Sequence, residues 1–144
     1  MSMSQELRYD HVAITVSDMK KSIAFYRDIL GFTVMGKLVL QDGNFLIVYL
    51  RTSNGAIVEL FEYTEKGRPL PAVLDDHDMG YRHMCFMVDD VDEYSRYLKE
   101  RGVEFLVEPK NASTTPLRLA FFKDPDGNKI EITAGKLELL PYEG

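Results

Sequence analysis

Two segments of the chain show the same succession of apolar and polar positions. In the first, apolar and polar residues alternate from Tyr9 to Val16, which is the period of a β-strand with one buried face. Ser17 or Asp18 can then cap a helix that ends at Gly31. Apolar side chains recur in that helix at spacings of four, three and four: Met19, Ile23, Tyr26 and Leu30. The pattern predicts a strand and then a helix that covers one face of a sheet.

The same first segment continues into three more strand-like runs separated by turn residues. These runs are residues 32–40, 45–52 and 56–62, and they complete a βαβββ unit. The second segment repeats the order, with a cap at Asp89 or Asp90 and a helix that ends at Gly102. Its helix carries Val91, Tyr94 and Leu98, and its strands are predicted at residues 82–88, 103–108, 117–123 and 128–133. Residues 63–80, which contain two prolines and two glycines, and residues 108–116 are predicted to be irregular.

The repeated order defines the expected fold class. We predict an α+β fold of two tandem βαβββ modules that form a cupped mixed sheet around a metal site. The chain of 144 residues with 45% hydrophobic content fits one domain, residues 1–144. Module one covers about 8–62 and module two about 81–134, with a linker at 63–80 and a tail at 135–144.

Composition narrows the expected partners and location. The net charge is −6 with a pI near 5.1, and no run of Lys and Arg suggests binding to nucleic acid or to an anionic membrane. A single cysteine, Cys85, excludes an intrachain disulfide and is compatible with the reducing cytoplasm. No apolar run is long enough to span a bilayer, and the first ten residues lack the apolar core of a secretory signal. We therefore expect a cytoplasmic protein.

The repeat also preserves two kinds of metal-binding side chain. At an offset of 72 residues, His11 falls on His83 and Glu59 falls on Glu131. In each half the histidine opens the first strand and the glutamate lies in the last strand. If those two strands are neighbours, each His–Glu pair projects from one face of its sheet. A repeat normally preserves the pattern of the core, so the preserved pairs indicate two half-sites.

The four side chains supply two imidazole nitrogens and two carboxylate groups. Such a set suits Zn, Ni, Co, Mn or Fe(II), and six-coordination would leave two adjacent positions for water or two substrate oxygens. We therefore expect a site for one divalent ion that chelates a small-molecule substrate through two vicinal oxygens.

Residues 8–134 resemble the vicinal oxygen chelate superfamily, which includes glyoxalase I, methylmalonyl-CoA epimerase, extradiol dioxygenases and the fosfomycin and bleomycin resistance proteins. Three segments carry the resemblance: "HVAITVSDMKKSIAFYRDILGF", "GYRHMCFMVDDVDE" and "FFKDPDGNKIEI". The resemblance implies metal ligands at His11, Glu59, His83 and Glu131, which look like the ligand set of bacterial-type glyoxalase I. It also implies nickel or cobalt as the favoured ion, and a homodimer whose modules pair within a chain or across the two chains.

The resemblance further implies a metal-dependent lyase or isomerase that acts like lactoylglutathione lyase. Its substrate would be the hemithioacetal of a 2-oxoaldehyde and a thiol, converted through proton abstraction and an enediolate. Either Glu131 or Glu59 would serve as the catalytic base. Residues that hold glutathione carboxylates in glyoxalase I have no clear counterpart here, and Arg82, Arg118 and Lys123 are only unspecific candidates.

Other functions of the same superfamily remain open. "GYRHMCFMVDDVDE" resembles epimerase sequence, although epimerases commonly have Gln where this chain has Glu59. Ring-cleaving dioxygenases and fosfomycin thiol transferases use a three-ligand set that would not require Glu59. A metal-free protein that binds an antibiotic is a further alternative, and the presence of all four ligand types argues against it.

Overall fold

The computed structural model describes residues 4–143, so residues 1–3 and 144 of the predicted domain lie outside the described residues. The chain divides into two compact units, residues 1–68 and 69–144. The boundary falls inside the predicted linker at 63–80. Each unit has its own four-stranded mixed sheet, and each is described separately below.

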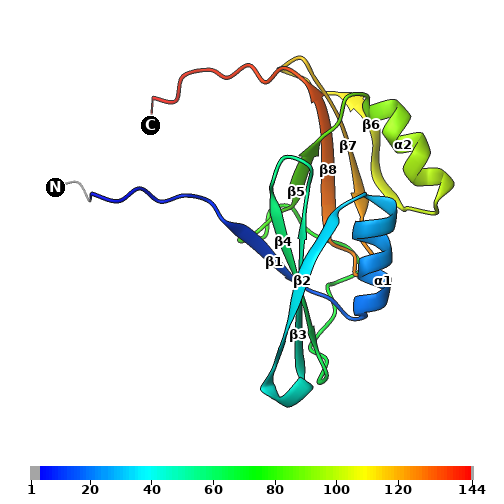
Figure 1. The fold of residues 1–144 in the computed structure, drawn as a ribbon. Coiled ribbons are helices and arrows are strands. Elements are labelled where there is room, and N and C mark those ends of the chain that lie inside the picture. Colours follow the sequence, from blue (N-terminus) through cyan, green and yellow to red (C-terminus); the bar gives the residue numbers. More distant parts are fainter. Residues whose placement is uncertain (1–3, 144) are drawn as a thin grey trace. The chain divides into compact units, whose positions relative to one another are not determined.

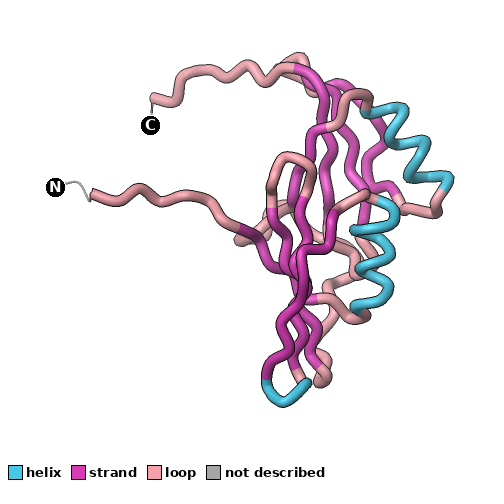
Figure 2. The backbone as a smooth tube through the Cα atoms, in the orientation of Figure 1, coloured by secondary structure: helices cyan, strands magenta, loops and turns pink. Residues whose placement is uncertain are grey.

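The first unit has the predicted βαβββ order (Figure 1). Its elements are β1 (His11–Thr15), α1 (Met19–Ile23), a π-helical segment (Ala24–Ile29), β2 (Thr33–Leu40), β3 (Phe45–Arg51) and β4 (Ile57–Tyr63). The strand order is β1-β4-β3-β2, in which β1 pairs with β4 in parallel and the other pairs are antiparallel. A short 3-10 turn, Gln41–Gly43, joins β2 to β3 at the tip of their hairpin (Figure 2). The last strand of the module therefore lies beside the first.

The helix of the first unit begins as predicted but continues differently. Asp18 is its N-cap, because its carboxylate accepts a hydrogen bond from the backbone N–H of Lys21. Gly31 follows the helix with φ +79°, the left-handed conformation expected of a helix stop. The predicted regular α-helix is wrong beyond Ile23, because the backbone widens into a π-helix. Met19 and Tyr26 of the predicted stripe are buried, whereas Ile23 and Leu30 are only half-buried and Ser22 and Phe25 are buried in addition.

The helix covers one face of the first sheet. The backbone N–H of Met19 at the start of α1 donates to Oε2 of Glu62 in β4, at 2.7 Å. Val58 and Leu60 alternate in register with Glu62 and are buried, so they share its helix-covered face. Glu59 therefore points to the opposite face, which the helix leaves uncovered.

The second unit repeats this topology. Its elements are β5 (Met84–Met87), α2 (Val91–Glu100), β6 (Phe105–Asn111), β7 (Leu117–Lys123) and β8 (Lys129–Gly135). The strand order is β5-β8-β7-β6, again with the first and last strands parallel. The α+β class with two tandem βαβββ modules is thus confirmed.

Helix α2 packs on the second sheet through a regular α-helical stripe. Asp90 is its N-cap and accepts from the backbone N–H of Glu93 at 3.0 Å. Val91, Ser95 and Leu98 recur at spacings of four and three and are all buried. An ion pair between Asp92 and Arg118 of β7 also ties the start of the helix to the sheet, with one N···O distance of 2.8 Å.

Two predicted boundaries in the second unit are wrong. Strand β5 begins at Met84, so His83 directly precedes the strand rather than lying within it. Strand β6 extends to Asn111 and so includes the first four residues of the stretch predicted to be irregular, 108–116. The bulged pairing of β6 with β7 accommodates Pro109 on this outer strand.

The helices in the described part of the chain are short. Among residues 4–143, none has the length and apolar character needed to cross a membrane.

Candidate metal-binding pairs

The first candidate pair is formed by β1 and β4 of the first unit. His11 is the first residue of β1, and Glu59 lies in β4 opposite Ala13, two positions further along the parallel register. This diagonal puts both side chains on the face that α1 leaves uncovered. Nε2 of His11 is in direct contact with Oε2 of Glu59. The predicted adjacency of the first and last strands, and of these two side chains, is confirmed in this unit.

The carboxylate of Glu59 is unusually buried for a glutamate. The residue is 5% exposed, whereas buried carboxylates in proteins are normally paired with a cation or ligate a metal. Its contacts are the His11 imidazole and a hydrogen bond from the hydroxyl of Tyr49, the residue opposite it on β3. That hydrogen bond, with burial next in importance, raises the pKa of Tyr49. Neither contact supplies a permanent positive charge, which fits a carboxylate that ligates a cation.

The other ring nitrogen of His11 is also engaged. Nδ1 lies 2.6 Å from Oδ2 of Asp10, the preceding residue. The hydrogen bond to Asp10 is the main reason that the pKa of His11 is raised, and burial opposes the shift. Because a carboxylate accepts, Nδ1 donates to Asp10, and Nε2, which faces Glu59, is the ring nitrogen left to ligate a metal.

The second candidate pair occupies the matching place in the second unit. Glu131 of β8 is opposite Cys85 of β5, and His83 lies two residues before Cys85. Nε2 of His83 is 3.2 Å from Oε1 of Glu131. The pair again lies on the face opposite α2, because Glu131 alternates with the buried, helix-facing Ile130 and Ile132. The predicted pairing of these two side chains is confirmed within this unit too.

Cys85 lies next to the second pair, and its surroundings do not activate its thiol as a nucleophile. Its thiol lies 3.7 Å from Oγ1 of Thr133 and is close to Glu131. Burial raises the pKa of the thiol to about 11, the Thr133 contact opposes the shift, and the charge of Glu131 adds to it. The thiol therefore stays protonated near neutral pH.

Each unit, taken by itself, contributes one His–Glu pair. Within residues 4–143, no three His, Cys, Asp or Glu side chains gather closely enough to hold a metal ion. The other histidine, His77, lies in an exposed loop, with its Nδ1 3.2 Å from Oδ1 of Asp75.

The three basic residues considered as substrate anchors have local partners. Arg118 is held by Asp92, Asn111 and the carbonyl of Pro109. The Arg82 guanidinium donates to the carbonyls of Asp75 and Asp78. Lys123 lies 3.6 Å from Glu104. These contacts give each cation a structural role within the second unit.

Sequence reasoning missed Asp10 and Tyr49, although both contact the first pair. Asp10 could have been noticed because it adjoins a candidate ligand in the sequence. Tyr49 carried a weaker signal: at the repeat offset it falls on Phe121, so both modules place an aromatic ring opposite their glutamate.

Comparisons with known proteins agree with this architecture. The model of the Glyoxalase/Bleomycin resistance protein/Dioxygenase superfamily matches residues 8–132. "Uncharacterized protein YaeR" of Escherichia coli is 32% identical over 127 residues, covering 85% of this chain and 92% of its own length. "Probable lactoylglutathione lyase" of Synechocystis is 29% identical over 127 residues, covering 85% of this chain and 91% of its own.

A solved structure shows the same fold. The glyoxalase family protein from Enterococcus faecalis superposes with a TM-score of 0.74 at 27% identity, covering 88% of this chain and 97% of that one.

Proposed function

Because the chain belongs to the Glyoxalase/Bleomycin resistance protein/Dioxygenase superfamily, we propose that it is a metal-dependent lyase or isomerase of the glyoxalase I type. The proposed substrate is the hemithioacetal of a 2-oxoaldehyde and a thiol. Relatives named lactoylglutathione lyase, at 25–29% identity, support this reaction class. The observation that carries the proposal is the His–Glu pair found at the same register in both units.

The proposed ligands are His11, Glu59, His83 and Glu131, which would bind one divalent ion. The residues fit such an ion in two respects. Each histidine presents Nε2 to the carboxylate of its partner, so a nitrogen and an oxygen donor already converge. Glu59 is buried beside His11 and Tyr49, and neither of these is a lysine or an arginine, so a cation would compensate its charge. Nickel or cobalt is favoured by family resemblance, and zinc, manganese and iron accept the same donors.

The chain's own groups account for the proposed proton transfer. When bound, the ion would supply Lewis acidity toward two vicinal oxygens of the substrate. The carboxylate of Glu131 or Glu59 removes the proton from the hydroxyl-bearing carbon next to the substrate carbonyl and returns it to the former carbonyl carbon, while the hydroxyl proton passes to the former carbonyl oxygen. The net change is a 1,2-hydrogen shift, so no redox cofactor is consumed. Arg82, Arg118 and Lys123 are engaged in structural contacts. We therefore propose that other groups bind the thiol part of the substrate.

A homodimer in the cytoplasm is part of the same proposal. The outer strand β2 exposes several apolar side chains: Val34, Met35, Leu38, Val39 and Leu40. Exposed apolar residues gathered on an edge strand favour a contact with another chain. Light scattering of the purified protein should give twice the mass of one chain, and a monomer would contradict this part.

The first experiment is elemental analysis of the untagged protein purified without chelator. We expect about one divalent ion per chain, and its loss in His83→Ala and in Glu131→Ala. His77→Ala is the matched control, because this histidine lies in an exposed loop outside both pairs. A native protein that neither contains nor takes up metal would contradict the proposal and favour a metal-free binding protein.

Turnover assays then separate the enzymatic alternatives. The metal-loaded protein should convert a 2-oxoaldehyde hemithioacetal, and each available thiol is tested in turn. Epimerisation of a 2-methyl-3-oxo thioester with no activity on the hemithioacetal would instead assign the epimerase reaction.

A further inference from the structure

The two His–Glu pairs have different neighbours at equivalent repeat positions. The residue before the histidine is Asp10 in the first unit and Arg82 in the second. The residue opposite the glutamate on the adjacent strand is Tyr49 in the first unit and Phe121 in the second. The repeat is therefore symmetric in its proposed ligands and asymmetric in the groups that contact them.

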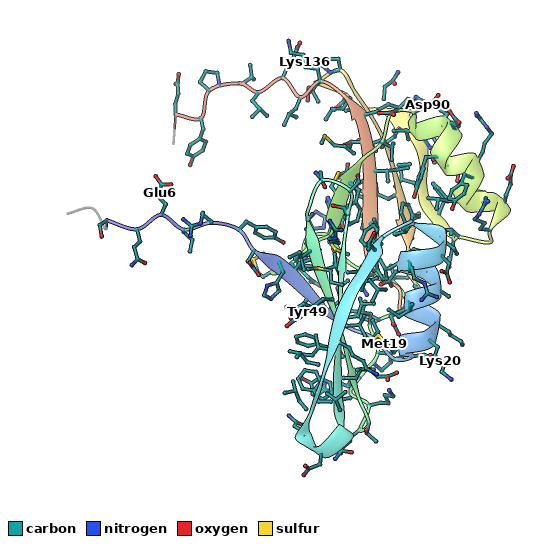
Figure 3. All side chains as sticks on the ribbon, viewed as in Figure 1. Glu6, Met19, Lys20, Tyr49, Asp90 and Lys136 are labelled. Atoms are coloured by element: carbon teal, nitrogen blue, oxygen red, sulfur yellow. The ribbon has the colours of Figure 1, made fainter. Side chains whose placement is uncertain are left out.

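In the first unit both neighbours hydrogen-bond to the pair. Asp10 fixes the imidazole by accepting from Nδ1 at 2.6 Å, which directs Nε2 toward Glu59. Tyr49 lies directly opposite Glu59 in the antiparallel pairing of β3 and β4, and its hydroxyl donates to the carboxylate. Strand β4, which carries Glu59, lies between β1, which carries His11, and β3, which carries Tyr49 (labelled in Figure 3). Tyr49 and His11 therefore contact Glu59 from opposite sides. The result is a continuous chain of polar contacts from Asp10 to Tyr49.

The two contacts differ in their surroundings. The Asp10 side chain is 81% exposed, so water competes for its hydrogen bond. The Tyr49 hydroxyl reaches a carboxylate that is 7% exposed, where a hydrogen bond is weakened less by solvent. The tyrosine is therefore the stronger of the two restraints.

In the second unit the corresponding residues do something else. The Arg82 guanidinium is held by backbone carbonyls of the preceding loop. Phe121 has no hydroxyl, and its ring packs edge-on against His83 with 5.1 Å between ring centroids and an interplanar angle of 87°. The second pair is thus positioned by packing rather than by hydrogen bonds from these two positions.

We propose that Asp10 and Tyr49 are positioning residues that hold His11 and Glu59 in a metal-binding arrangement before the ion arrives. The first unit would then be the preorganised half of the site. This inference rests on the proposed metal-dependent function. Residues that hydrogen-bond to metal ligands and orient them commonly raise metal affinity tenfold or more, because the ligands then lose less conformational entropy when the ion binds.

The test measures metal binding rather than turnover. Co²⁺ is titrated into the metal-free full chain in competition with a chromophoric chelator, and the visible absorption of the bound ion is recorded. The variants are Tyr49→Phe, Asp10→Ala and the double substitution. Tyr63→Phe is the matched control, since it removes a hydroxyl from the same unit while keeping a ring that stacks on Phe45. Thermal unfolding of each metal-free variant shows whether the fold has changed.

We expect Tyr49→Phe to weaken Co²⁺ binding about tenfold and to alter the visible spectrum. Asp10→Ala should cause a smaller loss, and the double substitution a greater loss than either. Tyr63→Phe should bind like the wild type. The metal-free Tyr49→Phe protein should unfold at a somewhat lower temperature, because the buried Glu59 carboxylate loses a hydrogen-bond donor, but it should remain folded at the temperature of the titration.

This inference would be overturned if the wild-type protein binds Co²⁺ and Tyr49→Phe and Asp10→Ala bind it with the same affinity and spectrum. The proposed function would then still stand. Weakened binding in Tyr49→Phe with an unchanged visible spectrum, or an equal loss of affinity in Tyr63→Phe, would also overturn it, because the role would then be general stability. A wild-type protein that binds no Co²⁺ or other divalent ion would overturn the proposed function itself.

Discussion

Removing the hydroxyl of Ser95 should stabilise the protein. Ser95 is 2% exposed on the buried stripe of α2, and its Oγ has no hydrogen-bond partner in the described part of the chain. A helical serine usually satisfies its hydroxyl through the carbonyl four residues earlier or through water. The Ser95→Ala variant deletes this unsatisfied group and little else.

The expected gain follows from three contributions. Leaving a buried hydroxyl unpaired costs about 1–3 kcal/mol, which the alanine variant recovers. Alanine also favours the helix over serine by about 0.5 kcal/mol. The void left by the oxygen, roughly 20 Å³ at about 24 cal/mol per Å³, costs about 0.5 kcal/mol. The net increase in the free energy of unfolding is therefore about 1–3 kcal/mol.

The assay is urea unfolding followed by circular dichroism, with chelator present so that metal binding does not contribute. Ser113→Ala is the control, because this serine lies exposed in a loop of the same unit and should change stability by less than about 0.5 kcal/mol. A Ser95→Ala protein that is equally stable or less stable than the wild type would refute the reasoning, since the hydroxyl would then have a partner. Metal uptake should be unaffected, because α2 covers the sheet face opposite Glu131.

Two further predictions concern pH. The hydrogen bonds and charge of Arg118 lower the pKa of Asp92 below its ordinary value of 3.8. The Asp92–Arg118 ion pair therefore stabilises the fold at pH values above 3.8, and this stabilisation is lost as the pH falls through the lowered pKa of Asp92. Arg118→Gln should therefore reduce the unfolding free energy at about pH 6 and much less at about pH 2, and urea midpoints that differ equally at both would contradict this. In protein freed of metal by a chelator, iodoacetamide should alkylate Cys85 slowly, because the pKa of its thiol is about 11, and the rate should rise with pH. Glu131→Gln removes a charge that raises this pKa, so mass spectrometry should show faster labelling, and an unchanged rate would refute the contact.

The sequence by itself determined the repeat, the order of elements and the candidate ligands. Strand alternation and helix periodicity are local patterns, so they located β1 and α2 to within a few residues. Asp18 and Asp90 could be identified as candidate caps because an N-cap contact spans only three residues. The repeat offset related His11–Glu59 to His83–Glu131, and the members of each pair were predicted to be neighbours if the first and last strands of a module lie side by side.

Only the tertiary structure decided the features that depend on contacts between distant residues. The π-helical turn at Ala24–Ile29 places Phe25 in the core, which a regular period does not predict. The sequence offers Arg118 as a candidate substrate anchor, but in the structure Arg118 is bound by Asp92 of α2, 26 residues earlier in the chain. Tyr49 meets Glu59 only through the register of β3 on β4. Local sequence patterns determine which face a side chain occupies, but strand pairing determines what it meets there, because pairing joins residues that are far apart in the chain.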